Sequence, residues 1–199
     1  MNNKNYHHGD LKEAIINSAQ RILKEQGADA LSLRVIASDV GVSHMAPYAH
    51  FKNKTELFQA IAANGFRSLA SRMEDVDIDQ KATVLILDYG TQYIEFAIAN
   101  APLYRMMLSQ TQVTGPQHSQ DTSNHMSQEL KDASKKPFTL LVSAFAELSP
   151  DKATQNVQAQ GAWAIVHGIA SLLIDGHLNI PDDMSIKQFL AVASMQMPQ

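Results

Sequence analysis

At 199 residues, with 45% hydrophobic and 18% charged residues and no cysteine, the chain can bury a core, and wholesale disorder, disulfides and thiolate metal sites are excluded. No apolar signal core opens the sequence and no stretch approaches ~20 uninterrupted apolar residues, so we expect a cytoplasmic protein without a membrane span. The net charge of −4 is uneven: residues 1–73 carry nine Lys/Arg and six Asp/Glu, or +3, and residues 74–199 carry seven and fourteen, or −7. Only the N-terminal part therefore suits a polyanion.

Helical periodicity runs through almost the whole chain, and no alternating strand pattern appears, which predicts an all-α fold of about nine helices. The first helix is expected over 10–26. A short helix over 33–40 follows, with Ser32 as its N-cap and Gly41 as its end. A second short helix is expected over 43–51. These elements form a small N-terminal head.

A longer helix is expected to begin at Asn53, and the acidic cluster between 74 and 79 marks the end of the head. We therefore predict two domains, 1–73 and 76–199. The second domain, which we call the body, is expected to be a helical bundle. Its first helix has about 20 residues and ends before Pro102, which suits the first turn of a next helix holding Leu103, Met106 and Met107. A Gln/Ser/Thr/Gly-Pro loop covers 109–124. Three more helices are expected: one to about 148, one over 151–174 and one over 185–195.

The two short elements of the head form a helix-turn-helix over about 32–51, whose second helix can enter the major groove of DNA. The hydroxyls, imidazole and ammonium of this segment can donate to phosphate oxygens; these residues are Ser43, Tyr48, His50 and Lys54. At the helix N-terminus, His44, Met45 and Ala46 are expected to contact base edges. Tyr48 alone is also compatible with simple packing, so the joint pattern carries the prediction.

Four sequence elements at fixed spacing resemble the tetracycline-repressor (TetR) family. They are Ile36-Ala37, Gly41-Val42-Ser43, Tyr48-Ala49-His50-Phe51 and Lys54-Thr55-Glu56-Leu57, within a match that covers about residues 6–70. The resemblance implies a homodimeric transcriptional regulator, most often a repressor, that is released from a palindromic operator by a small apolar effector. The chain departs from the pattern at Leu33, where many members carry Thr, so Ser32 is expected to take over that phosphate contact, and at Ala49, where bulkier residues are frequent.

The long helix over 151–174 offers two adjacent faces. Small residues on one face, Gly161, Ala164, Gly168 and Ser171, suit a subunit interface in a four-helix bundle with the last helix. The neighbouring face is expected to line an effector pocket together with aromatic and Met residues of preceding helices. The predicted pocket residues are Tyr89, Tyr93, Phe96, Met106, Met107, Trp163, His167 and Ala170. These residues are equally compatible with a plain core, and His167 with a structural hydrogen bond.

The segment from Trp163 to His167-Gly168 also resembles the Trp-x-x-x-His-Gly signature of one C-terminal subclass of the family, and residues 100–107 resemble a second segment of that subclass. No phosphate loop, nucleophile elbow or His-Glu-x-x-His motif is present, so we expect neither an enzyme nor a cofactor. His7 and His8, with His118 and His125, are not expected to bind a metal. The alternative function is a helical small-molecule-binding protein whose head no longer binds DNA.

Overall fold

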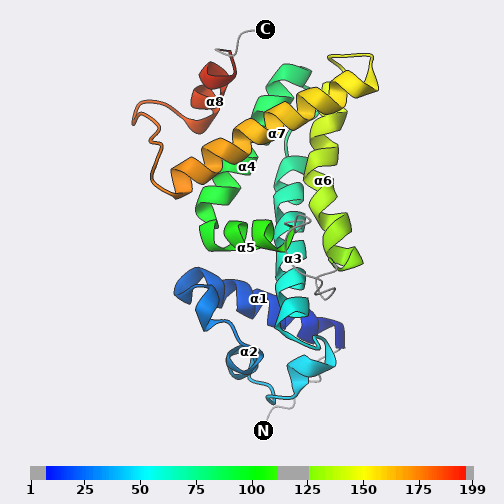
Figure 1. Ribbon diagram of the computed structural model, residues 1–199, viewed down its shortest axis with the longest axis vertical. Coiled ribbons are helices and arrows are strands. Elements are labelled where there is room, and N and C mark those ends of the chain that lie inside the picture. The colour runs from blue at the N-terminus through cyan, green and yellow to red at the C-terminus, as the bar shows by residue number, and fades with distance from the viewer. Residues whose placement is uncertain (1–7, 112–125, 196–199) are drawn as a thin grey trace, which may run out of the picture. The chain divides into compact units, whose positions relative to one another are not determined.

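The computed structural model describes residues 8–111 and 126–195, and the described part is entirely helical, as predicted (Figure 1). It contains eight α-helices and two short 3₁₀ helices. Their bounds are α1 (His8–Gln26), η1 (Ala28–Ala30), α2 (Leu33–Val40), η2 (Ala46–Ala49), α3 (Lys54–Glu74), α4 (Ala82–Ala99), α5 (Ala101–Thr111), α6 (Gln128–Phe145), α7 (Lys152–Ile174) and α8 (Ile186–Met195).

The chain divides into two compact units that alternate along the sequence. The first unit takes the described residues up to 65 and those of 102–133, and the second takes 66–101 and the described residues from 134 onward. Helix α3 contributes to both units without a break and ends only at Glu74. The division at the acidic cluster, into 1–73 and 76–199, stays a prediction about domains.

The helix starts and stops of the first unit follow the predicted capping residues. The hydroxyl of Ser32 accepts a hydrogen bond from the backbone N–H of Val35 at 3.2 Å and caps α2. Gly41 ends α2 with φ +78°, a left-handed conformation that glycine adopts without steric cost. Before α3, the side chain of Asn53 accepts from the backbone N–H of Glu56 at 2.9 Å. Losing an N-cap such as Ser32 costs ~1 kcal/mol of stability.

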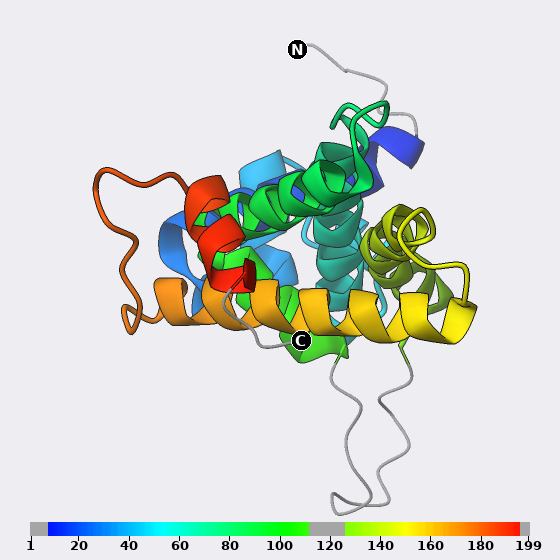
Figure 2. The ribbon, with the colours of Figure 1, turned by 90° about the horizontal axis from the view of Figure 1, so that it is seen from above.

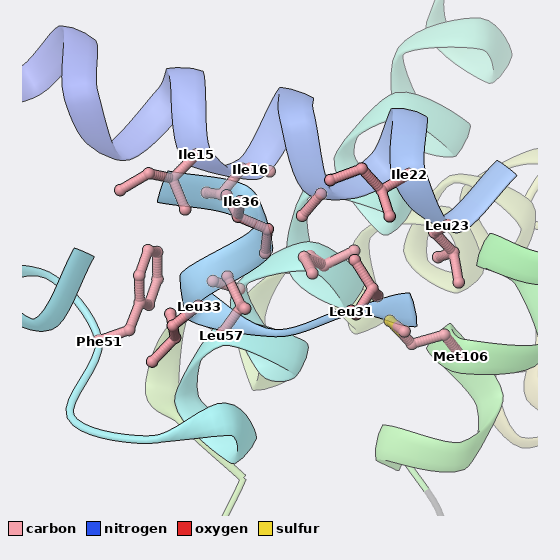
Figure 3. Packing of buried hydrophobic residues seen from close by; sticks show 13 residues of the cluster. Ile15, Ile16, Ile22, Leu23, Leu31, Leu33, Ile36, Phe51, Leu57 and Met106 are labelled. Atoms are coloured by element: carbon pink, nitrogen blue, oxygen red, sulfur yellow. The ribbon is translucent and has the colours of Figure 1, made fainter. Parts of the chain in front are cut away.

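The core of the first unit lies where α1, α2 and the first turns of α3 meet, and α5 contributes to it (Figure 3). Ile15, Ile36 and Leu57 are fully buried there, and Phe51 closes the side of the cluster next to η2. Fully burying one side chain of this size contributes about 1.5–3 kcal/mol, so this cluster is the main support of the helix-turn-helix.

The second short element of the helix-turn-helix differs from the prediction. A helix was expected over 43–51, but the structure has a turn at 44–45 and the 3₁₀ helix η2. Backbone bonds run from Ala46 N to Ser43 O at 3.0 Å and from Tyr48 N to Met45 O at 3.1 Å, the i to i+3 spacing of a 3₁₀ helix. Pro47 explains the difference, because it has no N–H to donate to the carbonyl of Ser43.

Helix α4 packs against both α7 and α8 in the second unit (Figure 2). A Cβ at Gly90 would lie 2.6 Å from Cδ2 of Leu190 and 3.0 Å from Cγ1 of Val166, so glycine permits this close approach. Asp151 caps α7, because its carboxylate accepts a hydrogen bond from the backbone N–H of Thr154 at 2.8 Å.

Helix α7 has an apolar face without a partner in the described part of the chain. Val157 is 67% exposed, Leu172 is also exposed, and a Cβ at Gly161 or Gly168 would meet no atom within 4 Å. Among the described residues α7 is the one helix that is long and apolar enough to cross a membrane, and 22% of its most apolar window is buried. A single helix of this kind is weak evidence for a span.

Candidate functional site

The turn and η2 expose the side chains that were expected to meet DNA bases. Met45 is 72% exposed and Tyr48 is 49% exposed, although both are large and partly apolar. Ser43 and His44 are also exposed, whereas Ala46 is half-buried. Water-exposed large side chains on a short, rigid turn are available for contact with a partner surface.

Two of the expected phosphate donors flank this turn. Ser32 uses an oxygen lone pair for the cap of α2, so its O–H proton remains available to a phosphate. Lys54 is exposed in the first turn of α3, and its Nζ lies 5.0 Å from the ring centroid of Phe58. A cation is unfavourable at the positive end of a helix unless an anion lies nearby. The position of Lys54 therefore favours a bound anion at this helix start.

His50 is less accessible than the sequence suggested. The residue is half-buried, and its Nε2 is a buried atom without a hydrogen-bond partner in the described structure. Its ring centroid lies 6.5 Å from that of Phe51. A buried Nε2 does not reach a phosphate in this conformation, and a phosphate contact by His50 stays a prediction.

A polar cluster ties α1 to α2. The carboxylate of Asp39 accepts a hydrogen bond from Oγ of Ser18 at 2.5 Å and pairs with the guanidinium of Arg21. These hydrogen bonds, with Ser18 contributing most, lower the pKa of Asp39 below its ordinary value. The cluster holds the helix that precedes the exposed turn, and sequence reasoning did not identify it.

Further exposed residues border the same surface. Arg34 and Val35 are exposed on the first turn of α2, and Lys52 is exposed immediately before α3. The sequence analysis used only the apolar face of this helix. Reading its opposite face would have identified Arg34, because a cation two residues after the N-cap also meets the positive end of a helix.

The second unit contains a cavity of about 510 Å³, including its open mouth. Its walls are aliphatic and aromatic side chains, mostly from α4, α7 and α8, with Met73 from α3 and Leu141 from α6. Three predicted pocket residues, Tyr89, Tyr93 and Trp163, line it. The mostly apolar walls are typical of a small-molecule site.

Aromatic contacts and one hydrogen bond order the cavity wall. The rings of Tyr93 and Trp163 meet edge to face with centroids 5.0 Å apart, and Phe138 meets Trp163 in the same manner at 5.8 Å. The hydroxyl of Tyr93 lies 3.0 Å from Nδ1 of His167. Burial lowers the pKa of His167 below its ordinary value, so the ring is neutral at pH 7 and its Nδ1 can accept this hydrogen bond.

The remaining predicted pocket residues lie elsewhere. Phe96 and Ala170 are buried in the second unit without lining the cavity. Met106 and Met107 belong to the first unit, where Met106 is part of the hydrophobic core and the sulfur of Met107 lies 2.6 Å from a Cβ built on Gly65. Contact between these four residues and an effector stays a prediction.

No group of three His, Asp or Glu that could hold a metal ion occurs within residues 8–111 and 126–195. The histidines at 7, 118 and 125 lie outside the described residues, as does most of the loop expected over 109–124. The described part of that segment is helical, because α5 continues to Thr111.

Comparisons with known proteins agree with these features. Residues 15–61 match the family model for bacterial regulatory proteins of the tetR family, and residues 86–192 match the model for the tetracyclin repressor-like C-terminal domain. The chain is 38% identical over 60 residues to the HTH-type nicotine-responsive transcriptional repressor HdnoR of Paenarthrobacter nicotinovorans, over 30% of this chain and 31% of that protein. It is 41% identical over 51 residues to the class C tetracycline repressor of Escherichia coli, over 26% of this chain and 23% of that protein.

The chain thus spans less than a third of the length of either curated relative. A solved structure of a protein of unknown function from Rhodococcus sp. RHA1 superimposes with a TM-score of 0.75 and 27% identity, over 96% of this chain and 95% of that chain. Because the C-terminal family model alone covers more than half of the residues, and the N-terminal model covers the helix-turn-helix, the chain belongs to the tetR family of bacterial regulatory proteins.

Proposed function

We propose that this protein is a sequence-specific DNA-binding transcriptional regulator, and that it acts as a repressor in the cytoplasm. The observation that carries the proposal is the exposure of Met45 and Tyr48 on a turn that the core and the Asp39 cluster hold in place. We assign base contacts to His44, Met45 and Ala46, and phosphate contacts to Ser32, Ser43, Tyr48, His50 and Lys54. Arg34 is added to the phosphate contacts because of its place on α2.

A homodimer follows from the exposed face of α7. Val157, Gly161, Ala164, Gly168 and Leu172 recur at helical spacing on this face, and Val192 is exposed on α8. Small residues at Gly161 and Gly168 leave room for close approach of a second helix. Burial of this face in a dimer accounts for an apolar helix that would otherwise be left in water.

The cavity is proposed to bind an effector that releases the protein from DNA. The two curated relatives named above are a nicotine-responsive repressor and a tetracycline repressor, which supports control by a small molecule. Such a ligand must bind one conformation better than another, because equal affinity for both shifts nothing. Trp163 and His167-Gly168 further support the Trp-x-x-x-His-Gly subclass, since Trp163 lines the cavity and His167 supports Tyr93.

The alternative, a ligand carrier with an inactive head, does not explain why Met45 and Tyr48 stay exposed to water. Selection of binding sites from random double-stranded DNA by the purified protein tests the proposal. The enriched sequences are expected to form an inverted repeat whose half-sites are about one or more helical turns apart, each turn being roughly 34–36 Å. Recovery of no common sequence would contradict it.

A further inference from the structure

The described residues that line the cavity of the second unit include side chains with hydrogen-bond donors but none with a charge. Among the residues that the structure describes, no ionisable side chain other than tyrosine lines it. The polar groups among its lining residues are the hydroxyls of Tyr89, Tyr93 and Ser194 and the indole N–H of Trp163. A charged ligand would lose its hydration here without gaining a counter-charge, which is costly in an apolar site.

Two of these hydroxyls already have partners within the protein. Tyr93 bonds to Nδ1 of His167, and Oγ of Ser194 donates to the backbone carbonyl of Leu190 at 2.7 Å. The hydroxyl of Tyr89 is different, since it makes no hydrogen bond within the described part of the chain, although the residue is only 4% exposed. The hydroxyl also keeps some accessible surface, since Nε2 of His50 is the one fully buried side-chain polar atom without a partner among the described residues. Its O–H is therefore free to donate to a ligand.

The charges nearest to the cavity do not favour an ionic ligand. Burial, and to a lesser extent the charge of Glu74, raises the pKa of Tyr89, so its hydroxyl stays a neutral donor. The carboxylate of Glu74 is itself paired with Nζ of Lys136 at 2.7 Å. Burial lowers the pKa of His167, which lies behind Tyr93, so this ring adds no positive charge near the cavity at pH 7.

We infer that this cavity takes an uncharged, mainly apolar molecule that presents a hydrogen-bond acceptor, such as the carbonyl of a ketone, ester or amide, to the hydroxyl of Tyr89. Only the identification of this molecule as the effector rests on the proposed function; the ligand class itself does not. Tyr89 is thereby assigned as a specificity-determining residue, and the aliphatic walls bind the rest of the molecule by burial of apolar surface.

Four probes with one shared ring system test the ligand class. They are 2-acetylnaphthalene, which is neutral with an acceptor, 2-ethylnaphthalene, which lacks the acceptor, 2-naphthoate, and the cation 2-naphthyltrimethylammonium. Trp163 is the only tryptophan of the chain and lines the cavity, so its fluorescence, corrected for probe absorbance, reports binding. Both ions are expected to bind at least ~100-fold more weakly than 2-acetylnaphthalene, because nothing in the cavity replaces their hydration.

The variant Tyr89→Phe removes the donor and keeps the ring. The ratio of the acetyl to the ethyl dissociation constants is expected to change by roughly 10-fold in this variant, and to stay as in the wild type in the control Tyr104→Phe, a buried tyrosine of the first unit. The inference is overturned if either ion binds as tightly as 2-acetylnaphthalene, if Tyr89→Phe leaves the ratio unchanged, or if no probe quenches Trp163 saturably. The comparison of the two ions with the neutral probe needs only the wild-type protein.

Failure of this inference is distinguishable from failure of the proposed function. Binding of the ligand-free protein to its selected DNA sites does not involve Tyr89. Intact sequence-specific DNA binding with the wrong probe preference would overturn only the ligand class. Loss of DNA binding with the expected probe preference would overturn the regulator and leave the ligand class standing.

Discussion

The hydroxyl of Tyr93 on α4 and Nδ1 of His167 on α7 are 3.0 Å apart, beside the cavity. Together with the edge-to-face contact between Tyr93 and Trp163, this bond connects the two longest walls of the cavity. The bond requires a neutral acceptor on His167 if the tyrosine donates, and the lowered pKa of His167 supplies it at pH 7. The protonation state of one histidine therefore bears on the stability of the second unit.

Stability is expected to decrease as the pH falls below about 6.5, the ordinary pKa of histidine. Folded His167 has a lower pKa than unfolded His167, so the unfolded state takes up the extra proton first and gains stability in this range. Thermal unfolding between about pH 7.5 and 5.5 measures the effect. His167→Gln should flatten this part of the curve relative to wild type, while His177→Gln at an exposed site should not. Equal pH dependence in wild type and His167→Gln would refute the assignment.

The cluster around Asp39 predicts an acid-side effect in the first unit. The pKa of Asp39 is lower in the folded than in the unfolded state. The stability that its ionised carboxylate contributes is therefore fully present above the ordinary pKa of 3.8 and is lost as the pH falls through the folded pKa. Asp39→Asn is expected to lower the melting temperature at pH 7 and to reduce the loss of stability in acid. It should also weaken DNA binding, because α2 is held less firmly on α1. Retention of both the wild-type melting temperature and the acid profile would show that the cluster is dispensable.

Lys54→Ala is expected to weaken binding to all DNA sequences alike. Each lost phosphate contact reduces the counterions released, so the slope of log K against log salt should become shallower by about one per subunit. The matched control is Lys152→Ala, an exposed lysine at the start of α7 in the second unit. A changed base preference with an unchanged salt slope would place Lys54 among base contacts instead.

A substitution at Gly161 tests whether the exposed face of α7 forms the dimer interface. No atom lies within 4 Å of a Cβ built there, so Gly161→Leu fits an isolated subunit and gains about 0.5–1 kcal/mol in helix propensity. In a close-packed dimer the same side chain collides with the partner. Sedimentation should show dissociation at least ~10-fold easier than for wild type or Gly161→Ala, with no loss of helicity by circular dichroism. A Gly161→Leu protein that stays as dimeric as Gly161→Ala would move the interface elsewhere.

Local signals made much of the fold predictable from the sequence. The capping bonds and backbone turns made by Ser32, Gly41 and Asn53 involve only neighbours three or four residues away. The structure confirms each of these residues at the start or the end of a helix. The signal for the 3₁₀ helix η2 is equally local, because Pro47 lacks the N–H that an α-helix needs. The prediction of a helix over 43–51 followed the helical periodicity and did not use this signal.

Longer-range features were harder to predict. Periodicity identified Met106 as buried, but it does not say which core receives a side chain, and Met106 lies in the core of the first unit. The bonds of Ser18 and Arg21 to Asp39 join residues 21 and 18 positions apart, for which single-sequence patterns hold no signal. That the hydroxyl of Tyr89 has no hydrogen-bond partner among the described residues is likewise visible only once its neighbours are known.

The most direct test of the central claim is the affinity of the dimer for its selected DNA site, measured by fluorescence anisotropy across a salt series. The account predicts that log K falls linearly with log salt, and that the selected site binds at least ~10³-fold tighter than a scrambled duplex of the same composition. Met45→Ala should reduce this ratio while leaving the salt slope unchanged, since Met45 contacts bases and carries no charge. Equal affinity for both duplexes, or affinity that does not change with salt, would contradict the claim that this protein is a sequence-specific DNA-binding regulator.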